Sequence, residues 1–436
     1  MNLNQALRNV EKSRIAFVGS GGKTTALFQL ARSMKPPVIV TCSTHLGAWQ
    51  TGAADQHIVI DHPGELDRYS RQLEGVTLFT GPIDAHDRYL GLDRQSLDEL
   101  GNLADRLGLP LLIEADGSRQ RPLKAPNAQE PVIPDWVDRV VLVAGLSGIG
   151  KPLNDDFIHR PEIFSRLSGL AIGETVNEDG LARELTHGEG GLKNIPPNAP
   201  KTLILNQADD SQSEAAGLRV AAKVRDAFPE VIITSLRDEK IIRVIEPVAG
   251  IVLAGGGSSR FGRPKMLLPW KDTVIIRHIV ETALESGLDP VIVVLGAMNQ
   301  TIRQELTGLS VLFCENPDWE SGQSTSVRRG VAILPPQTGA VLFLLSDQPQ
   351  ITVDLIQALI DRHQTSLAAV IAPRFHGQRA NPVLFDQSTF RSLLALQGDT
   401  GGRAIFPQFP PQFLDWEDEN ILLDIDTPDD YEGLRG

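Results

Sequence analysis

The stretch Ile251-Val-Leu-Ala-Gly-Gly-Gly-Ser-Ser-Arg-Phe-Gly-Arg-Pro-Lys265 decides how the second half of the chain is organised. The apolar run over 250–254 predicts a buried strand, and three glycines, 255–257, follow it directly. Glycines at a strand end let backbone N–H groups approach an anion closely. Arg260 and Lys265 then add positive charge. The stretch therefore predicts a nucleoside triphosphate site, with an ordinary glycine-rich turn as the alternative.

Bulk composition limits the class of protein. The 436 residues favour two domains, each large enough to bury a core. A formal net charge of −14 argues against a general nucleic-acid binder, whose binding surface would be basic. Two cysteines, Cys42 and Cys314, give no disulfide framework and favour a reducing compartment. No apolar run approaches the roughly 18 residues of a membrane span. We therefore expect a soluble cytoplasmic protein with neither nucleic-acid nor membrane partners.

Strand-like runs alternate with amphipathic helical patterns through both halves of the chain. This alternation is typical of α/β layers with mainly parallel sheets. Glu246 and Pro247 precede the strand that leads into the glycine stretch, which places a domain boundary there. We predict two three-layer α/β/α domains, residues 1–246 and residues 247–436.

The first half contains its own glycine-rich loop. Residues 14–18 read as a strand and 26–34 as a helix, and Gly19-Ser-Gly-Gly-Lys-Thr-Thr25 joins them. Loop amides and a helix N-terminus hold phosphates, Lys23 would reach the outer phosphates, and the Thr24 hydroxyl would bind Mg²⁺. Phe17 stands where the usual P-loop pattern has its first glycine, so the loop resembles the shorter one of Mur ligases. A plain β-turn-α junction is the alternative. The candidate nucleotide-binding residues are Gly19, Gly21, Gly22, Lys23, Thr24 and Thr25.

Two carboxylates follow the apolar run over 109–113. Glu114 and Asp116 are two residues apart, so both would point to one side of a continuing strand. Carboxylates at the tip of a buried strand suit magnesium ligands or a base that positions water, and with Thr24 they are the candidate metal ligands here. A solvated turn is the alternative. The cations that follow could clamp an anionic substrate or be exposed charges: Arg119, Arg121 and Lys124.

Two further strand ends carry polar residues. At 42–45, hydroxyls near a phosphate or Mg²⁺ are expected, and a metal pair of Cys42 and His45 is the alternative, with too few ligands for structural zinc. Residues 206–209, Asn-Gln-Ala-Asp, are similar to the guanine-reading motif of GTPases, with Gln207 in place of the lysine. Ordinary turn residues would explain the same pattern.

Residues 10–235 resemble the YqeC family, which is named for accessory proteins of selenium-dependent molybdenum hydroxylases. The resemblance implies an accessory NTP-binding domain and a molybdenum hydroxylase as a partner, and it names no reaction. The blocks that carry it are Val18-Gly-Ser-Gly-Gly-Lys-Thr-Thr25, Thr41-Cys-Ser-Thr-His45, Glu114-Ala-Asp-Gly-Ser-Arg119, Pro122-Leu-Lys-Ala-Pro126, Glu130-Pro-Val-Ile-Pro134 and His159-Arg-Pro161.

Residues 248–436 resemble MobA-like nucleotidyltransferases, whose signature reads roughly L-A-x-G-x-S-x-R-x-G-x-x-K, as in 253–265. They look most like the molybdenum cofactor cytidylyltransferase branch, in which Leu-Leu-Pro follows the lysine, here 267–269. The resemblance implies a Rossmann-like domain that uses CTP, with Arg260 and Lys265 as catalytic cations. The nucleotide contacts that it implies are Leu253, Ala254, Gly255, Gly256, Gly257, Ser258 and Ser259.

A serine-rich helix start adds to this expected nucleotide site. Residues 321–326, Ser-Gly-Gln-Ser-Thr-Ser, precede a helical pattern and match a block of the same branch. Serines at a helix N-terminus could hold a base edge or a phosphate, and Ser324 is the candidate. A simple helix cap is the alternative.

Two aspartates are the expected magnesium ligands. Asp347 follows the most apolar run of this half, 340–345, and the family resemblance assigns it to the metal. The alternative, a cap of the next helix, suits Thr352 better. Asp424 and Asp426 would share one face of a strand, and the family's D-I-D-T-P block makes Asp426 the second ligand.

Two late blocks resemble the acceptor side of the family, 379–385 and 398–403. They suggest Asn381, Asp399 and Arg403 as contacts to a pterin or its phosphate, with an ordinary Gly-Asp loop as the alternative. The leading hypothesis is thus a magnesium-dependent CTP:molybdopterin cytidylyltransferase that releases pyrophosphate, fused to an accessory NTP-binding domain. GTP or another NTP is an open alternative to CTP. A sugar phosphate or other small phosphate as acceptor, and a cofactor carrier with a nucleotide switch, are the other hypotheses.

Overall fold

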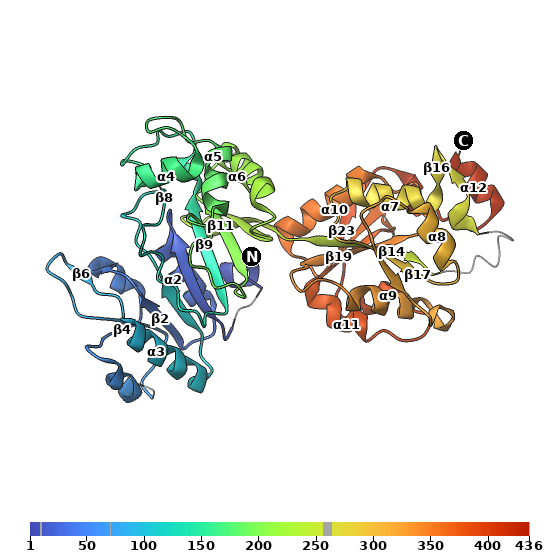
Figure 1. The fold of residues 1–436 in the computed structure, drawn as a ribbon. Helices are drawn as coiled ribbons and strands as arrows, with labels where there is room; N and C mark the ends of the chain where they lie inside the picture. Colours follow the sequence, from blue (N-terminus) through green and yellow to red (C-terminus); the bar gives the residue numbers. More distant parts are fainter. Residues whose placement is uncertain (9–10, 70, 256–263, 436) are drawn as a thin grey trace. The chain divides into compact units, whose positions relative to one another are not determined.

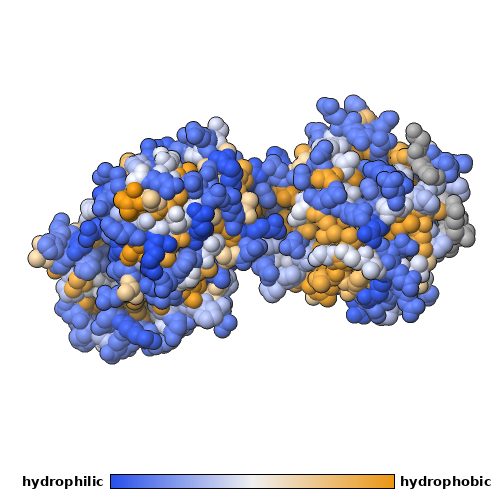
Figure 2. All heavy atoms as spheres, turned by 45° about the horizontal axis from the view of Figure 1, so that its top comes forward, coloured by the Kyte–Doolittle hydropathy of each residue, from blue (hydrophilic) through white to orange (hydrophobic). Residues whose placement is uncertain are grey.

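The computed structural model describes residues 1–8, 11–69, 71–255 and 264–435. The chain forms two compact units, Met1–Ile245 and Glu246–Gly436, and both are α/β (Figure 1). Hydrophilic residues cover most of the face that Figure 2 shows of each unit, with separate apolar groups among them. Within the described ranges, no helix combines the length and the apolar character that a membrane span requires.

The N-terminal unit is built on a nine-stranded sheet in the order β13-β12-β11-β9-β1-β7-β2-β5-β4. Only the pairing of β12 with β13 is antiparallel. The strands are β1 (Arg14–Gly19), β2 (Val38–Cys42), β4 (Gln56–Val59), β5 (Val76–Thr80), β7 (Leu111–Glu114), β9 (Arg139–Gly145), β11 (Lys201–Asn206), β12 (Glu230–Ser235) and β13 (Lys240–Ile245). The helices are α1 (Leu3–Ala6), α2 (Lys23–Ser33), α3 (Arg94–Leu107), α4 (Pro161–Ser168), α5 (Glu178–Thr186) and α6 (Ser211–Val224).

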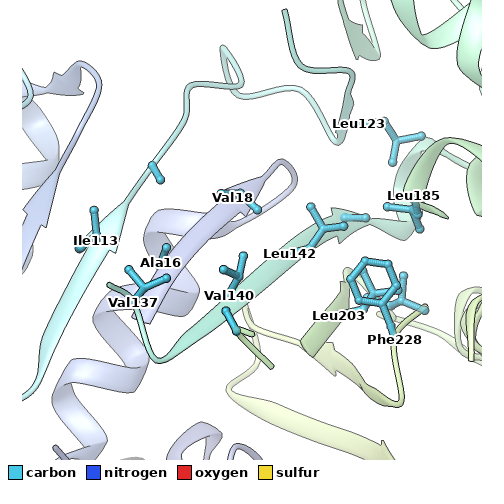
Figure 3. Packing of buried hydrophobic residues seen from close by; sticks show 14 of the residues in the cluster. Ala16, Val18, Ile113, Leu123, Val137, Val140, Leu142, Leu185, Leu203 and Phe228 are labelled. Carbon is cyan, nitrogen blue, oxygen red and sulfur yellow. The ribbon is translucent and has the colours of Figure 1, made fainter. Parts of the chain in front are cut away.

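Apolar runs that are buried on both faces explain why these strands are central. β1 lies between β7 and β9, in register with both, and most of its residues are fully buried. Figure 3 shows Val18 of β1 and Leu142 of β9 in the packed cluster that also holds Leu203 and Phe228. Because parallel neighbours run in the same direction, the carboxyl ends of β1, β7 and β9 meet at one edge of the sheet.

The C-terminal unit has an eight-stranded mixed sheet, with the main order β18-β17-β14-β19-β22-β20-β21. The strands are β14 (Val248–Ala254), β17 (Val291–Leu295), β18 (Leu312–Glu315), β19 (Ala340–Leu345), β20 (Val370–Phe375), β21 (Gln378–Arg379), β22 (Val383–Asp386) and β23 (Gln412–Asp415). The helices are α7 (Ile275–Glu285), α8 (Asn299–Glu305), α9 (Gln323–Ala332), α10 (Val353–Ser366), α11 (Phe390–Leu394) and α12 (Pro428–Arg435).

Alternate residues of β14 belong to two different cores. Val252 packs in a cluster with residues of α7 and α10, whereas Ile251 packs in a cluster with residues of α9 and α11. The strand is therefore buried on both faces, as its continuous apolar sequence predicts. β14 pairs in parallel with β17 on one side and with β19 on the other, so the strand order reverses at β14. Ligands of open α/β sheets bind at such reversal points.

One predicted strand is wrong. Residues 419–422 form a short 3-10 helix, η8 (Glu419–Leu422), and 423–427 belong to no helix or strand. Asp and Asn in this segment favour turns over strands. Gln350 donates to the carbonyl oxygens of Asn420 and Leu423, and Ile425 N–H donates to Asp347 O, so other parts of the unit hold the segment. The next helix, α12, begins at Pro428, a residue type that suits the first turn of a helix.

Candidate functional site

The Lys265 ammonium lies at the centre of a charged group in the C-terminal unit. Its Nζ is 2.9 Å from Asp347 Oδ2 and 3.6 Å from Asp426 Oδ1, and it donates to the Ile425 carbonyl at 3.0 Å. Lys265 begins the short 3-10 helix η4 (Lys265–Leu267), while Asp347 stands just beyond the carboxyl end of β19. The structure thus brings together three residues that the sequence predicted for one site.

The carboxylates around Lys265 have the chemistry of a magnesium site. Asp347 Oδ1 is buried and has no hydrogen-bond partner among the described residues, and the Asp426 side chain is 61% exposed. Asp424 accepts from Gln348 at 2.6 Å, and burial, followed by the nearby charge of Asp347, raises the pKa of Asp424. Oxygen atoms of this kind are what Mg²⁺ prefers.

A metal held here would need oxygen atoms from a ligand as well. Within the described ranges, no group of three or more His, Cys, Asp or Glu side chains is arranged to hold a metal ion. Magnesium commonly uses one or two carboxylates together with substrate phosphates. Asp424 had no predicted role in the site, although its position two residues before Asp426 could have indicated one.

The nucleotide contacts expected at the end of β14 are only partly described. Leu253 and Ala254 end the strand, next to β19, which leads to Asp347. Gly255 is close-packed, because a Cβ on Gly296 would come within 2.5 Å of the Gly255 carbonyl oxygen. The remaining predicted residues of the loop, Gly256, Gly257, Ser258, Ser259 and Arg260, lie outside the described residues.

Ser324, the candidate at the serine-rich helix start, makes a hydrogen bond inside the protein. Its side chain is buried and donates to the Gly398 carbonyl at 2.6 Å. The Asp399 carboxylate accepts from the Gln323 N–H at 3.1 Å, at the N-terminus of α9. Asp399 therefore anchors a loop to a helix start in this structure. The residues that these two hydrogen bonds join are 74 and 76 positions apart, so no local pattern could reveal the pairing.

Asn381 and Arg403 lie together, as expected for one side of a substrate site. Arg403 donates to Asn381 Oδ1 at 3.0 Å. Both residues line a small cavity of about 200 Å³, together with Leu253 of β14 and with Asp424. The cavity therefore connects the end of β14 with the carboxylate group and with two polar side chains that a substrate could contact.

The glycine loop of the N-terminal unit is tightly built. Gly19, Gly21 and Gly22 all have positive φ, at 96°, 74° and 129°. A Cβ on Gly21 would come within 2.5 Å of Gly145 N, so only glycine fits there. The N–H groups of Gly19 and Gly21 donate to Asp116 and to the Arg121 carbonyl. These two amides are therefore engaged, whereas the amides of the first turn of α2 lack partners within the helix and are available to an anion.

Lys23 is almost completely buried beneath this loop. Its side chain is 3% exposed, and Nζ donates to the Gly19 carbonyl at 2.8 Å. The same ammonium is 3.2 Å from Asp116 Oδ1 and 3.8 Å from Glu114 Oε1. The sequence predicted that Lys23 would reach outward to phosphates, whereas in this structure its charge is compensated within the protein.

Glu114 and Thr24 share a hydrogen bond beside a large cavity. Thr24 Oγ1 donates to Glu114 Oε2 at 2.8 Å and accepts from Gln50 at 2.9 Å. Burial, opposed by Lys23, raises the pKa of Glu114. Thr24, Thr25 and Glu114 line the cavity, which measures about 1110 Å³.

Asp116 has a different place from its predicted companion Glu114. It is 2% exposed, accepts from Gly19 N–H, and pairs with Lys124 at 2.7 Å. Its carboxylate therefore anchors the loop and is absent from the wall of the cavity as described. The predicted metal role fits Thr24 and Glu114 better than Asp116, because only those two face the cavity.

Glu130, His159 and Arg160 line another wall of the same cavity, and Lys124, which is buried, contacts Glu130. Lys124 and Arg160 both donate to Glu130 Oε2, at 3.1 and 2.7 Å. These bonds outweigh the effect of burial and lower the pKa of Glu130 to about 2. Burial and the neighbouring cations, Arg160 first, lower the pKa of His159 to about 4. Arg119 and Arg121 also line the cavity. Acidic residues line the cavity as well, Asp87, Asp155 and Glu162 among them, so its lining is of mixed charge, and Arg119 and Arg121 are groups that could pair with an anionic ligand.

The other polar strand ends serve the fold. Asn206 donates to the Gly21 carbonyl at 2.6 Å and accepts from Leu236 N–H, so its side chain holds the glycine loop. Asp209 accepts from Ser235. Cys42 is buried, which raises the pKa of its thiol, and His45 lies 3.7 Å from Asp84. The burial of Cys42 and the contact of His45 with Asp84 do not favour the alternative of a Cys42–His45 metal pair.

Comparisons with known proteins match the two units separately. Residues 15–162 match the family described as YqeC protein, and residues 250–412 match the family described as MobA-like NTP transferase domain. The YqeC protein of Escherichia coli, described as uncharacterized, is 27% identical over 46% of this chain and 78% of its own length.

Two further relatives match over 42–43% of this chain. The purine catabolism protein PucB of Bacillus subtilis is 32% identical, over 43% of this chain and 95% of its own length. The molybdenum cofactor cytidylyltransferase of Escherichia coli is 28% identical, over 42% of this chain and 92% of its own length. The two halves of this chain are thus similar to two separate groups of proteins.

Proposed function

Because the chain belongs to the MobA-like NTP transferase family through residues 250–412 and also carries a YqeC domain, we propose that it transfers a cytidylyl group to molybdopterin. Its C-terminal unit is a nucleotidyltransferase domain. The reaction would join the α-phosphorus of CTP to the terminal phosphate of molybdopterin and release pyrophosphate. The choice of CTP and of molybdopterin is supported by the similarity to the Escherichia coli cytidylyltransferase.

The observation that carries the proposal is the position of Lys265 between Asp347 and Asp426. A cation held at the reversal point of the sheet can neutralise negative charge that builds on the α-phosphate and on the leaving pyrophosphate. The two aspartates fix the direction of the ammonium, so little reorganisation is needed when that charge develops.

Two carboxylates beside a lysine also suit a divalent cation. Asp347, through its buried Oδ1, and Asp426, through its exposed carboxylate, are the residues that would hold Mg²⁺. When bound, Mg²⁺ would supply charge neutralisation at the phosphate oxygens. Arg260, Gly256, Gly257, Ser258 and Ser259, which lie outside the described residues, complete the proposed triphosphate contacts together with Leu253, Ala254 and Gly255.

The acceptor needs no general base, because a terminal phosphate is already ionised at pH 7. The residues of the chain then have to bind and orient it. Asn381 and Arg403 are the proposed contacts, since they line one cavity together with Leu253 and Asp424. Positioning of this kind, together with charge stabilisation, accounts for most of the catalysis in phosphoryl-type transfer.

The N-terminal unit is proposed to be an accessory P-loop-like NTP-binding domain that acts in the maturation of a molybdenum hydroxylase. The first turn of α2, with Thr24 and Thr25, would contact the phosphates, and Thr24 with Glu114 would face the metal. Binding of the outer phosphates by Lys23 would require the ammonium to leave Asp116 or Glu114.

Pyrophosphate release tests the proposal directly. We would measure it with each of the four NTPs, with and without molybdopterin, for the wild type and for Asp347→Ala. The expected result is release that requires CTP and molybdopterin and falls by about 10²–10³ in the variant, by analogy with the loss of one charge-stabilising group.

A matched control is Asp415→Asn, because Asp415 is an exposed aspartate that pairs with Arg374 on β20. Its rate should equal that of the wild type. Release with CTP and another small phosphate as acceptor would move the proposal to that acceptor. Tight molybdopterin binding without pyrophosphate release from any NTP would overturn it in favour of a cofactor carrier.

A further inference from the structure

A second cavity, of about 890 Å³, lies against α2 in the N-terminal unit. Its walls come from α1, α2, the 3-10 helix η1 (Ala48–Ala53) and the start of β13, elements that are far apart in the sequence. It shares four lining residues with the cavity beside the glycine loop: Thr24, Thr25, Trp49 and Gln50. The two cavities are therefore neighbours across the first turn of α2.

The lining of this second cavity combines polar side chains with an apolar part that includes two aromatic residues, Phe28 and Trp49. Trp49 is 74% exposed, more than any other large hydrophobic residue in the described ranges, and Phe28 forms a buried part of the wall. Ile241 of β13 closes another side. An exposed indole in the wall of a cavity offers a large flat apolar surface, and covering that surface with a ligand is favourable.

Hydrogen bonds of Gln50, the neighbour of Trp49 in the chain, hold η1 next to the first turn of α2. Gln50 donates to Thr24 Oγ1 at 2.9 Å and accepts from Gly47 N–H at 2.9 Å. The same glutamine thus ties η1 to the helix start at which phosphates would bind. Two other wall residues are engaged as well, since Gln29 donates to the Leu236 carbonyl and Arg32 pairs with Asp55. The wall is therefore held in place before any ligand binds.

We propose that this cavity binds the nucleoside of a triphosphate whose phosphates occupy the first turn of α2, with the base stacked on Trp49. The inference rests on the proposed NTP binding by the N-terminal unit. A nucleotide joins an anionic end to a flat apolar end, and the two neighbouring cavities offer surfaces of those two kinds. Stacking on an aromatic side chain accepts any base, because every base has a π-face.

The contacts favour a nucleotide over an apolar peptide or a partner protein as the occupant of this cavity. Such a partner would have no reason to reach Thr24 and Thr25, which face both cavities. A nucleotide would contact both of them. A nucleoside site at this place would put the base beside η1 and not beside Asn206, whose amide is engaged by the glycine loop.

Binding of NTPs and of inorganic tripolyphosphate separates the nucleoside from the phosphates. All measurements use the full chain with Lys265→Ala as background, so that nucleotide binding by the C-terminal unit is reduced. Titration calorimetry with each NTP is expected to show an affinity about tenfold lower or more for Trp49→Ala, and a partial recovery for Trp49→Phe. The affinity for tripolyphosphate should be the same in all three proteins.

Tryptophan fluorescence gives a second readout. Nucleotides should quench emission in the background protein and in Trp136→Phe, whose indole donates to Asp98, but not in Trp49→Phe. The nucleoside site would be overturned if Trp49→Ala and its background bound NTPs equally well. It would also be overturned if Trp49→Ala lost affinity for tripolyphosphate to the same extent as for NTPs. If tripolyphosphate bound as tightly as the NTPs, the nucleoside site would be overturned too, whereas the proposed phosphate site would be supported. Nucleotide binding that needs Trp49, with no tripolyphosphate binding, would support the nucleoside site and remove the proposed phosphate site.

Discussion

The two candidate phosphate sites each place a lysine between two carboxylates, but at different depths. The side chains of Lys23 and of the adjacent Asp116 are each 3% exposed. The Lys265 side chain is 18% exposed, and the Asp347 and Asp426 side chains are 25% and 61% exposed. A buried ion pair holds a fold together only while it is complete, whereas a partly exposed one contributes less to stability and leaves its charges within reach of a ligand. The difference suggests that the N-terminal site is part of the structure of its unit, and that the C-terminal site is built mainly for chemistry.

The sharpest way to break this comparison is to remove each ammonium and measure stability. Lys23→Met leaves Asp116 and Glu114 buried with one cation fewer, so the free energy of unfolding of the N-terminal unit should fall by about 3 kcal/mol, at the low end for a broken buried pair because Lys124 remains. Lys265→Met should cost less than about 1 kcal/mol. Urea unfolding of both full-length variants would check this, and equal losses would contradict the comparison.

The ranking of the two lysine substitutions should be reversed when activity is measured in place of stability. Lys265→Ala is expected to lower pyrophosphate release by about 10²–10³, because it removes a cation from the place where charge develops. Lys23→Ala should leave the rate of the C-terminal unit unchanged at a temperature at which the protein stays folded. A comparable drop for Lys23→Ala would mean that the chemistry of the two units is linked.

Asn206 tests whether the N-terminal loop is preassembled. Asn206→Ala removes a buried amide that bonds both Gly21 O and Leu236 N, so it should cost about 1–3 kcal/mol and weaken nucleotide binding by the N-terminal unit. Asn177→Ala is the control, because it removes the N-cap of α5, at a cost of about 1 kcal/mol. Nucleotide affinity should fall only for Asn206→Ala, and an equal fall for both would indicate a general loss of stability.

The last expected effect concerns pH. Burial raises the pKa of Glu184 to about 8, compared with 4.5 for an ordinary glutamate. Between these values the folded protein holds a proton that the unfolded chain has released, so the contribution of Glu184 to stability decreases as pH rises from about 4.5 to 8.

Glu184→Gln should remove that decrease and raise the melting temperature at pH 8 by a few degrees, with little change at pH 5. Glu178→Gln is the opposite control, because its hydrogen bond from Arg219 lowers the pKa of Glu178. That variant should be slightly less stable at pH 8. A Glu184→Gln protein with the same pH dependence as the wild type would refute the proton linkage.

Much of the fold could be predicted, because local patterns determine it. The run over 340–345 coincides with β19, and Thr352 caps α10 by accepting from Leu355 N–H, as the sequence indicates. The run over 14–18 is likewise β1, extended by one residue. A continuous apolar run and a helix cap are properties of a few neighbouring residues, so a single sequence displays them.

The parts that sequence reasoning missed depend on distant contacts. The grouping of Lys265 with Asp347 and Asp426 was predicted only through a family resemblance, because the lysine is 82 residues from Asp347. The internal roles of Asn206 and Ser324 have no local signal, since Asn206 bonds a carbonyl 185 residues away. Asp424 was placed on a strand that does not form, because a hydrogen bond from Ile425 to Asp347 holds that segment in an irregular shape.

The attachment of the 398–399 loop to α9 has a consequence for protein engineering. Gly322 has φ 108°, and a Cβ there would come within 2.6 Å of Asp399 Cα, so the loop backbone packs directly on the residue before the helix. Any side chain at position 322 must displace the loop, and any insertion in the loop must release Ser324 and Gln323. Redesign of the proposed acceptor pocket therefore has to treat the loop and the helix start as one unit, to be replaced together.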